Sequence, residues 1–200
     1  MNHESENFKI PPCAIPSIPW VKLWRAGAEV CADLIYQKQS LRNRYAVLGV
    51  NGTIWLTIPV ESTQGVRTPF REIRISGNTW QRVHWRTLQS AYARAPYWEH
   101  YAASLQDIFL KKHPFLLDLH LEIIHWIMSA GLKPERTAET LPFPPQIPAE
   151  IWEPSYHWPD QPAYLQVFSD RHPFQSNLSI IDLLMNLGPR SALYLNQVLI

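Results

Sequence analysis

The chain has 200 residues, of which 46% are hydrophobic and 12% aromatic, and its formal net charge at pH 7 is +1. This length and apolar content fit one packed domain and exclude an intrinsically disordered chain. The longest apolar stretch, residues 115–128, contains two acidic residues and two histidines and falls short of the roughly 20 apolar residues that a membrane span needs, so we expect no membrane span.

The first 36 residues are predicted to contain one short helix and one strand. Residues 1–9 are polar and expected to be flexible. Ser17 can cap a short helix, which Gly27 then ends. The residues after this helix, 30–36, are predicted to form a strand.

A β-hairpin is the clearest local prediction. Residues 46–50 and 53–58 are rich in β-branched and aromatic side chains, and Asn51-Gly52 lies between them. Asn-Gly supplies the two positive φ angles of a type I′ turn, which joins antiparallel strands tightly. Residues 71–75 alternate between polar and apolar and are predicted to form a further short strand.

Three amphipathic helices are predicted in the middle of the chain. The first covers 79–95, with Asn78 and Gln81 forming a capping box at its start. The second covers 97–112. The third begins at Pro114, ends at Gly131, and is apolar on nearly all sides, so we expect it to be central.

The last third combines an irregular segment with a final helix. Residues 134–162 contain eight prolines, which exclude regular structure, and isolated aromatic residues there predict a wrap over the core. Residues 164–168 are predicted to form a strand. Ser179 and Asp182 are predicted to form a capping box that opens a last helix, which Gly188-Pro189 ends.

These elements predict one α/β domain over residues 1–200. We expect a small mixed sheet that contains the hairpin, three or four helices packed against it, and a proline-rich C-terminal wrap.

The basic residues are concentrated in one part of the chain. Between Tyr36 and Arg94 there are nine basic and two acidic residues, a net charge of +7, and the other residues sum to −6. Arginine presents a planar, permanently charged fork that fits phosphate or carboxylate, so this window predicts an anionic ligand. Its densest part precedes the hairpin and comprises Lys38, Arg42, Asn43 and Arg44. The alternative for this part is a solvated basic turn that protects an edge strand.

A second basic pair lies on the first central helix. Arg82 and Arg86 are one turn apart and repel each other unless an anion neutralises them. His84 lies on the apolar face with Trp80 and Leu88. A partly buried imidazole can act as a general acid or base, although a hydrogen-bonded core histidine is the more common outcome.

Several other chemistries lack a motif. The sequence has no HExxH pattern and no glycine-rich phosphate loop, so we expect no metal site and no cofactor. Cys13 and Cys31 could form a disulfide, but two separate thiols in a reducing compartment are favoured. Asp182 is a candidate acid that its predicted cap already explains. Nucleic acid is an alternative anionic partner, because tryptophan and tyrosine are interleaved with arginine, but the modest pI near 7.9 argues against it.

Five stretches along most of the chain carry recognisable motifs: 36–44, 51–60, 80–87, 91–98 and 177–189. In their residues and their order they resemble the motifs of the WbqC-like family of bacterial proteins. Two stretches depart from the family: 12–20, where the family has an aromatic segment, and the proline-rich 134–162.

This resemblance implies a bacterial cytoplasmic protein, and the family takes its name from surface-polysaccharide (O-antigen) gene clusters. It implies a transferase-like enzyme that acts on a nucleotide-activated sugar, with acyl or aminoacyl transfer to an amino sugar as the reaction. The alternative is a non-enzymatic module that binds an anion, nucleic acid or protein. The residues expected to contact the phosphorylated small molecule are Lys38, Arg42, Asn43, Arg44, Arg82 and Arg86, with His84 as the proton carrier.

Overall fold

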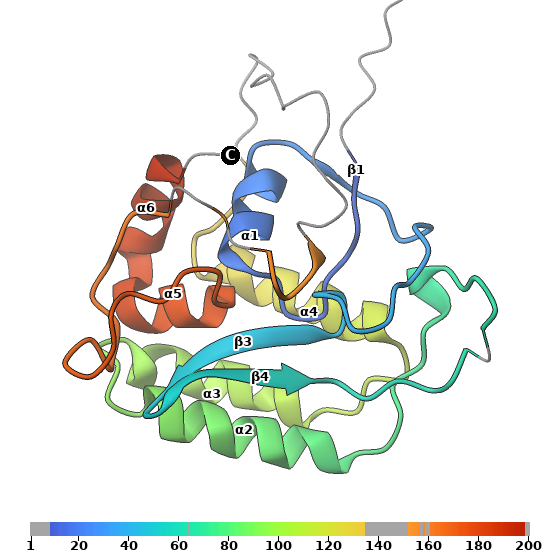
Figure 1. Cartoon of the computed structure of the whole chain (residues 1–200), viewed down its shortest axis with the longest axis horizontal. Helices are drawn as coiled ribbons and strands as arrows, with labels where there is room; N and C mark the ends of the chain where they lie inside the picture. The colour runs from blue at the N-terminus through green and yellow to red at the C-terminus, as the bar shows by residue number, and fades with distance from the viewer. Residues whose placement is uncertain (1–8, 64, 135–151, 157, 159–160, 199–200) are drawn as a thin grey trace, which may run out of the picture.

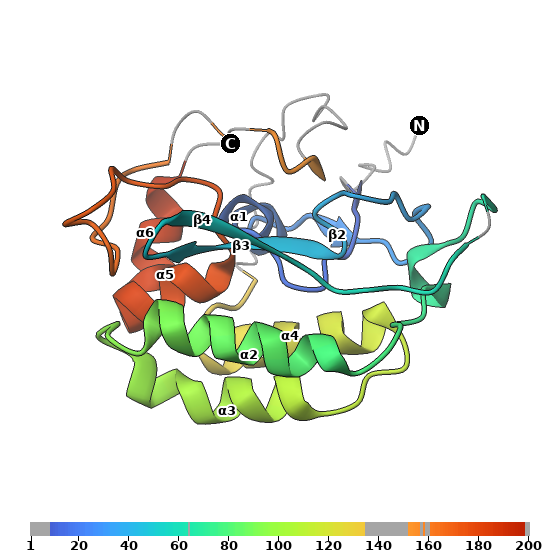
Figure 2. The ribbon, with the colours of Figure 1, turned by 60° about the horizontal axis from the view of Figure 1, so that its bottom comes forward.

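The computed structural model describes residues 9–63, 65–134, 152–156, 158 and 161–198 (Figure 1). The helices are α1 (Ile18–Arg25), α2 (Thr79–Tyr92), α3 (Trp98–Leu110), α4 (Leu116–Ser129), α5 (Ile180–Leu187) and α6 (Ser191–Gln197), and a hairpin is formed by β3 (Arg44–Gly49) and β4 (Gly52–Thr57). Helix α2 lies along one side of the hairpin, with α3 beyond it (Figure 2). Strand β3 also contacts α5, which packs against α1 and α6.

The predicted α/β class is confirmed, with a small amount of sheet. Strands β3 and β4 form an antiparallel pair, and β1 (Lys9–Ile10) pairs in parallel with β2 (Glu29–Val30). None of the helices in the described ranges combines the length and the apolar character that crossing a lipid bilayer requires.

The hairpin is confirmed, but its predicted turn is wrong. The register pairs Gly49 with Gly52, so the two loop residues are Val50 and Asn51. Positive φ occurs at Gly52 (107°) and not at Asn51. This register needs only one left-handed residue, directly after the loop, and glycine adopts that conformation without steric cost.

The predicted strand over 30–36 is wrong over most of its length. Strand β2 ends at Val30, and Ile35 forms only an isolated bridge to Pro69. The predicted strand over 164–168 is also absent. Ile35 meets the single loop residue Pro69, and Tyr164 and Gln166 bind the buried Asp182. An alternating sequence pattern cannot distinguish such contacts from pairing with a neighbouring strand.

The predicted strand over 71–75 is replaced by a short 3-10 turn, η1 (Phe70–Glu72), and two isolated bridges. In these bridges Arg74 pairs with Phe115 and Ile75 pairs with Val60. The segment therefore fastens the start of α4 to the chain that follows the hairpin.

The three central helices and the first helix are confirmed. The Ser17 side chain accepts a hydrogen bond from the Trp20 amide at 3.4 Å, as its predicted capping role requires. Asn78 makes no capping hydrogen bond, and Gln81 donates its side-chain amide to the Lys111 carbonyl, so the predicted capping box of α2 is wrong. Helix α4 begins two residues after Pro114.

Helix α4 lies in the core, as its sequence predicts. Leu119, Ile123 and Ile127 on this helix are fully buried. The amide of Phe115 donates to the Asp118 side chain at 3.0 Å and caps the start of the helix. Gly131, with φ at 90°, ends it.

The predicted capping role of Asp182 is wrong. Ser179 makes no capping hydrogen bond. The Asp182 carboxylate is instead completely buried and accepts hydrogen bonds from the Tyr164 hydroxyl and, at 3.2 Å, from the Gln166 amide. Burial raises the pKa of Asp182 to about 6 because it disfavours the charged form.

The chain continues as a helix after the predicted last one. Gly188, with φ at 53°, ends α5 as predicted. A single 3-10 turn, η3 (Gly188–Arg190), then leads into α6.

Trp152 is buried, and Tyr156 and Trp158 pack against the main core. Most of the predicted wrap, together with residues 1–8, lies outside the described residues, and a single domain over 1–200 stays a prediction.

We predict that Gly188→Ala destabilises the protein more than Gly131→Ala. A Cβ atom at Gly188 would lie 2.4 Å from ring atoms of Tyr97, whereas one at Gly131 would meet nothing within 4 Å. The left-handed conformation alone costs about 1 kcal/mol, and the clash adds roughly 1–3 kcal/mol. Urea denaturation of both variants measures the difference, and equal losses of stability would contradict the packing of Tyr97 on Gly188.

We also predict that Asp182 makes stability depend on pH. An aspartate whose pKa rises from 3.8 to about 6 on folding stabilises the protein below pH 4, and this stabilisation is lost as pH rises to about 6. The expected loss is about 3 kcal/mol, and Asp182→Asn should remove it because an amide does not titrate. Urea denaturation at pH 4 and pH 7 tests this, with Asp107→Asn on the exposed face of α3 as the control. An unchanged pH dependence in Asp182→Asn would exclude the assignment.

Candidate functional site

The loop that precedes β3 is tightly folded. We call residues 36–44 the basic loop. Gln39 has a left-handed φ of 60°, and the buried Ser40 donates its hydroxyl to the Gln37 carbonyl at 2.7 Å. Ser40 thereby closes the turn that directs the next residues into β3.

Arg42 is drawn into the protein interior by this turn. Its side chain is 5% exposed, and Nη1 donates to Gln37 Oε1 at 2.8 Å and to Ser40 Oγ at 3.3 Å. Nε is buried and has no hydrogen-bond partner among the described residues. Burial lowers the pKa of Arg42, and Cys13 and Glu153 nearby counteract this effect. No acidic group in the described part of the chain forms an ion pair with it.

The next two residues share this incomplete pairing. Asn43 donates its amide to the Ile58 carbonyl at 2.9 Å, but its buried Oδ1 accepts no hydrogen bond, and the buried Nε of Arg44 donates none. Among the described residues, eight buried side-chain nitrogen or oxygen atoms have no hydrogen-bond partner. Three of them belong to consecutive residues of the basic loop, and the other five are spread over four residues elsewhere. Buried polar atoms without a partner are rare and costly, so this concentration points to a group that binds there.

Tyr36 lies beside both arginines. Burial raises the pKa of its hydroxyl to about 12, although Arg44 and Arg42 oppose this shift. The hydroxyl is therefore neutral and can donate a hydrogen bond to an anion. Both cysteines are free thiols, as favoured from the sequence, and Cys13 is buried with its pKa raised to about 12, so it is no reactive nucleophile.

The other predicted anion-binding residues are more exposed. Lys38 is exposed at the outside of the basic loop. Arg82 and Arg86 are exposed on α2, on the helix face opposite His84, because residues two apart lie about 200° apart around a helix. The structure brings Arg42, Asn43 and Arg44 together with Tyr36, and it does not bring the two α2 arginines to this place.

The two faces of the hairpin explain why Arg44 lies apart from Arg82 and Arg86. Tyr45 points towards α2, where its hydroxyl contacts His84. Arg44 precedes Tyr45 in the strand, so its side chain points to the opposite face. Arg44 and the two α2 arginines therefore lie on opposite sides of the hairpin.

His84 is a neutral, hydrogen-bonded residue of the core. It is 3% exposed, its Nδ1 lies 3.0 Å from the Tyr45 hydroxyl, and the backbone of Thr57 forms a further hydrogen bond with the ring. Burial lowers the pKa of His84 to about 4. These contacts explain the residue structurally, and its predicted role as proton carrier stays a prediction. Among the described residues no group of three or more potential metal ligands gathers at one point.

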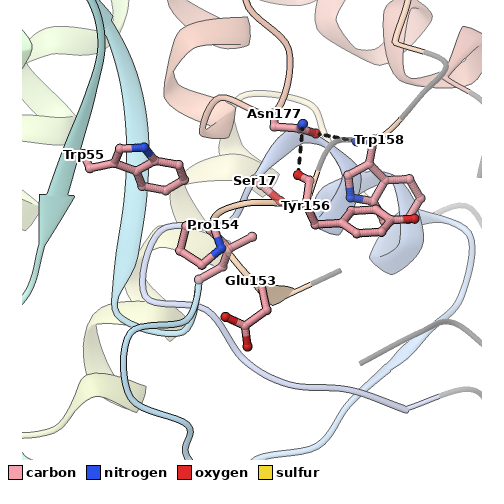
Figure 3. A pocket seen from close by; sticks show the side chains of 8 residues that line it. Ser17, Trp55, Glu153, Pro154, Tyr156, Trp158 and Asn177 are labelled. Atoms are coloured by element: carbon pink, nitrogen blue, oxygen red, sulfur yellow. Dashed lines mark hydrogen bonds between the residues drawn. The ribbon is translucent and has the colours of Figure 1, made fainter. Parts of the chain in front are cut away.

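A small aromatic pocket (Figure 3) is lined in part by Leu41 of the basic loop. The Leu41 amide donates to the Trp152 carbonyl at 2.8 Å and joins the loop to the segment that forms the pocket wall. Asn177, with φ at 60°, donates its amide to the Tyr156 carbonyl at 3.2 Å and accepts from the Trp158 amide at 3.3 Å. The lining residues are Ser17, Leu41, Trp55, Glu153, Pro154, Tyr156, Trp158 and Asn177.

The pocket and the basic loop lie on the same face of the hairpin. Trp55 pairs with Ala46, and Arg44 pairs with Thr57. Paired and alternate residues share a face, and such diagonal neighbours are roughly 7–8 Å apart. The pocket has a volume of about 10 Å³, room for about one water molecule.

Sequence reasoning missed the residues of this pocket. Tyr156 and Trp158 were recognised only as isolated aromatics over the core. Trp55 carried a signal, because it sits in an alternating strand on the same side as Arg44. Asn177 begins a stretch that resembles the family, but nothing in the sequence links it to a pocket. Glu153 carried no signal, because only the tertiary fold brings it to Leu41.

Comparison with known proteins places the chain in a family. It is 32% identical over 98 residues to "Uncharacterized protein Rv1507c" of Mycobacterium tuberculosis. That match covers 48% of this chain and 42% of the relative, so the chain spans less than half of that protein. No solved structure matches the chain. Residues 17–139, more than half of the chain and including the basic loop, the hairpin and α2 to α4, match the WbqC-like protein family. The chain belongs to the WbqC-like protein family.

Proposed function

We propose that the basic loop binds the phosphate of a nucleotide-activated sugar, and that the protein is a transferase-like enzyme of bacterial surface-polysaccharide synthesis in the cytoplasm. The observation that carries the proposal is the buried, unpartnered Nε of Arg42 and of Arg44 on either side of Asn43. Family membership supports the polysaccharide pathway only by association.

The basic loop offers what a phosphate needs. Arginine donates through Nε and the terminal nitrogens in a fixed plane, which fits two phosphate oxygens at once. Arg42 is held by Gln37 and Ser40, so little side-chain freedom is lost when a ligand binds. Tyr36 adds a neutral donor beside both guanidinium groups. The free Oδ1 of Asn43 can accept a hydrogen bond from a hydroxyl of the ligand.

A second candidate function is a non-enzymatic module that binds an anionic surface. The observation that favours it is the position of Arg82 and Arg86, which are exposed on the outer face of α2 and have no acidic partner among the described residues. Binding along such a surface would weaken steeply with salt, because it rests on long-range attraction to phosphates. Binding in the half-buried basic loop would be screened less.

We predict that Arg44→Ala weakens phosphate binding and that Arg86→Ala does not. A ligand at 100 times its dissociation constant stabilises the protein by about 2.7 kcal/mol. Loss of one arginine contact raises the dissociation constant about tenfold, so the same ligand concentration should stabilise Arg44→Ala by only about 1.4 kcal/mol. The measurement is a thermal-shift series with inorganic pyrophosphate and a panel of nucleotide sugars.

The two variants also separate the candidate functions. Equal responses of Arg44→Ala and the wild type would refute the basic-loop site. A loss of response in Arg86→Ala alone would favour the surface-binding module.

We predict that His84 stabilises the fold. In His84→Phe the Tyr45 hydroxyl would remain buried without its partner, which costs roughly 1–3 kcal/mol, and the double variant with Tyr45→Phe should recover part of this loss. The His84 ring should also stay neutral down to pH 5, because its pKa is about 4. Urea denaturation and the NMR shift of the ring measure these effects. Unchanged stability in His84→Phe would instead support the catalytic hypothesis.

A further inference from the structure

The hairpin has one covered edge and one free edge. In an antiparallel pair of strands, the backbone N–H and C=O groups of alternate residues point away from the partner strand. In β3 these outward-facing residues include Ala46 and Leu48. The Ala46 carbonyl accepts a hydrogen bond from the Ser179 amide at 2.9 Å, and the Leu48 amide donates to the Tyr92 hydroxyl at 3.3 Å. The outer edge of β3 is therefore covered by the fold.

The outer edge of β4 has no such cover. The Ile58 amide donates to the Asn43 carbonyl at 2.9 Å, and this inward bond fixes the alternation, so that Thr53 and Trp55 direct their backbone groups outward. No backbone group in the described part of the chain bonds to them there. Residues 53–55 are exposed, and Figure 1 shows β3 between β4 and α1. The free edge presents donors and acceptors at the spacing of a further β-strand.

One uncovered side of α2 runs beside the hairpin. His84 points to the hairpin, where it forms a hydrogen bond with the backbone of Thr57 in β4. Trp85 stacks on Trp98 of α3, with ring centroids 5.6 Å apart. Successive helix residues are 100° apart, so Val83 and Trp85 lie on opposite sides of His84. Val83 therefore lies on the side of α2 that α3 leaves open, and it is 58% exposed.

This open side of α2 carries positive charge. Arg86 follows Val83 by three residues, which places the two side chains next to each other on the helix surface. Arg82 and Arg86 are exposed and have no acidic partner among the described residues, and α2 contains no acidic residue. Strand β4 is uncharged and contains no proline, so it lacks the usual devices that keep other strands from an edge.

We propose that the outer edge of β4 binds an extended acidic segment of a partner protein as an additional strand. Backbone hydrogen bonds to Thr53 and Trp55 hold the segment. Its acidic side chains face α2 and Arg86, and the apolar side chains that alternate with them lie beside Trp55. The inference does not rest on the phosphate site in the basic loop.

Two other occupants fit this surface less well. Pairing of two β4 edges about a two-fold axis would place both copies of α2 on the same face of the joined sheet. The Arg86 side chains of the two copies would then approach and repel each other. A nucleic acid strand would be attracted to Arg82 and Arg86, but it lacks the alternating N–H and C=O groups that match the strand edge.

Fluorescence polarisation of the full chain with labelled heptapeptides at low salt tests the proposal. One peptide alternates glutamate with valine, a second alternates lysine with valine, and a third is the glutamate peptide methylated on every backbone amide. The glutamate peptide should bind about tenfold more tightly than either of the others. The reasons are that the lysine peptide is repelled by α2 and that methylation removes the backbone donors.

Two pairs of variants separate the edge from the charge. Thr53→Pro removes an outward N–H and keeps the ladder with β3, whereas Thr53→Ala removes the same side chain and keeps the N–H. The affinity for the glutamate peptide should fall about tenfold in Thr53→Pro and stay unchanged in Thr53→Ala. Arg86→Glu should weaken the glutamate peptide and strengthen the lysine peptide. Lys9→Glu makes the same charge change on β1, far from α2 (Figure 1), and should do neither.

Equal binding of the three peptides, or equal binding by Thr53→Pro and Thr53→Ala, would overturn the edge site. Binding of labelled oligothymidylate that Arg86→Glu abolishes and Thr53→Pro leaves intact would assign the surface to nucleic acid instead. A dimer in sedimentation velocity that Thr53→Pro dissociates would assign the edge to a second copy. Urea denaturation checks that Thr53→Pro folds, and if it does not, the methylated peptide decides the question.

Discussion

Burial of strand β3 on both faces is the constraint on which the site depends. Tyr45 and Val47 belong to the main core, and Ala46 and Leu48 form a second small core with Leu178. A one-residue shift would exchange these two sets of side chains, so double burial fixes the register of the strand. The direction of the Arg44 side chain, at the first residue of the strand, follows from that register.

The register brings charged side chains to the boundary of the interior. Arg44 is the first residue of β3, and Arg42 is held beneath the basic loop by Gln37 and Ser40. Two buried histidines are better paired: His84 contacts Tyr45 at 3.0 Å, and His120 lies 2.6 Å from the Cys13 carbonyl. Evolution commonly leaves polar atoms unsatisfied only where a ligand or water completes them. The contrast explains why we assign binding to the loop and not to His84 or His120.

The aromatic pocket and the basic loop are built from distant parts of the sequence. Leu41 binds Trp152, and Asn177 binds Tyr156 and Trp158. The site therefore forms only after the C-terminal part of the chain has packed on the hairpin.

Sequence patterns predicted the helices and the hairpin because long amphipathic periods and Asn-Gly turns are local signals. They failed where the partner was distant. Residues 71–75 alternate as a strand does, but they meet Phe115 and Val60 singly. Asp182 has the spacing of a helix cap, yet Tyr164 and Gln166 bind it. The basic loop was visible as a charge cluster, whereas its burial and its separation from Arg82 and Arg86 required the fold.

A crystal structure of the protein with inorganic pyrophosphate tests the central claim most directly. The phosphate-binding basic loop predicts electron density for the anion within hydrogen-bond distance of Nε of Arg42 or Arg44, close to the Tyr36 hydroxyl. Density only at Arg82 and Arg86 on α2, or an empty basic loop at a saturating concentration, would contradict it.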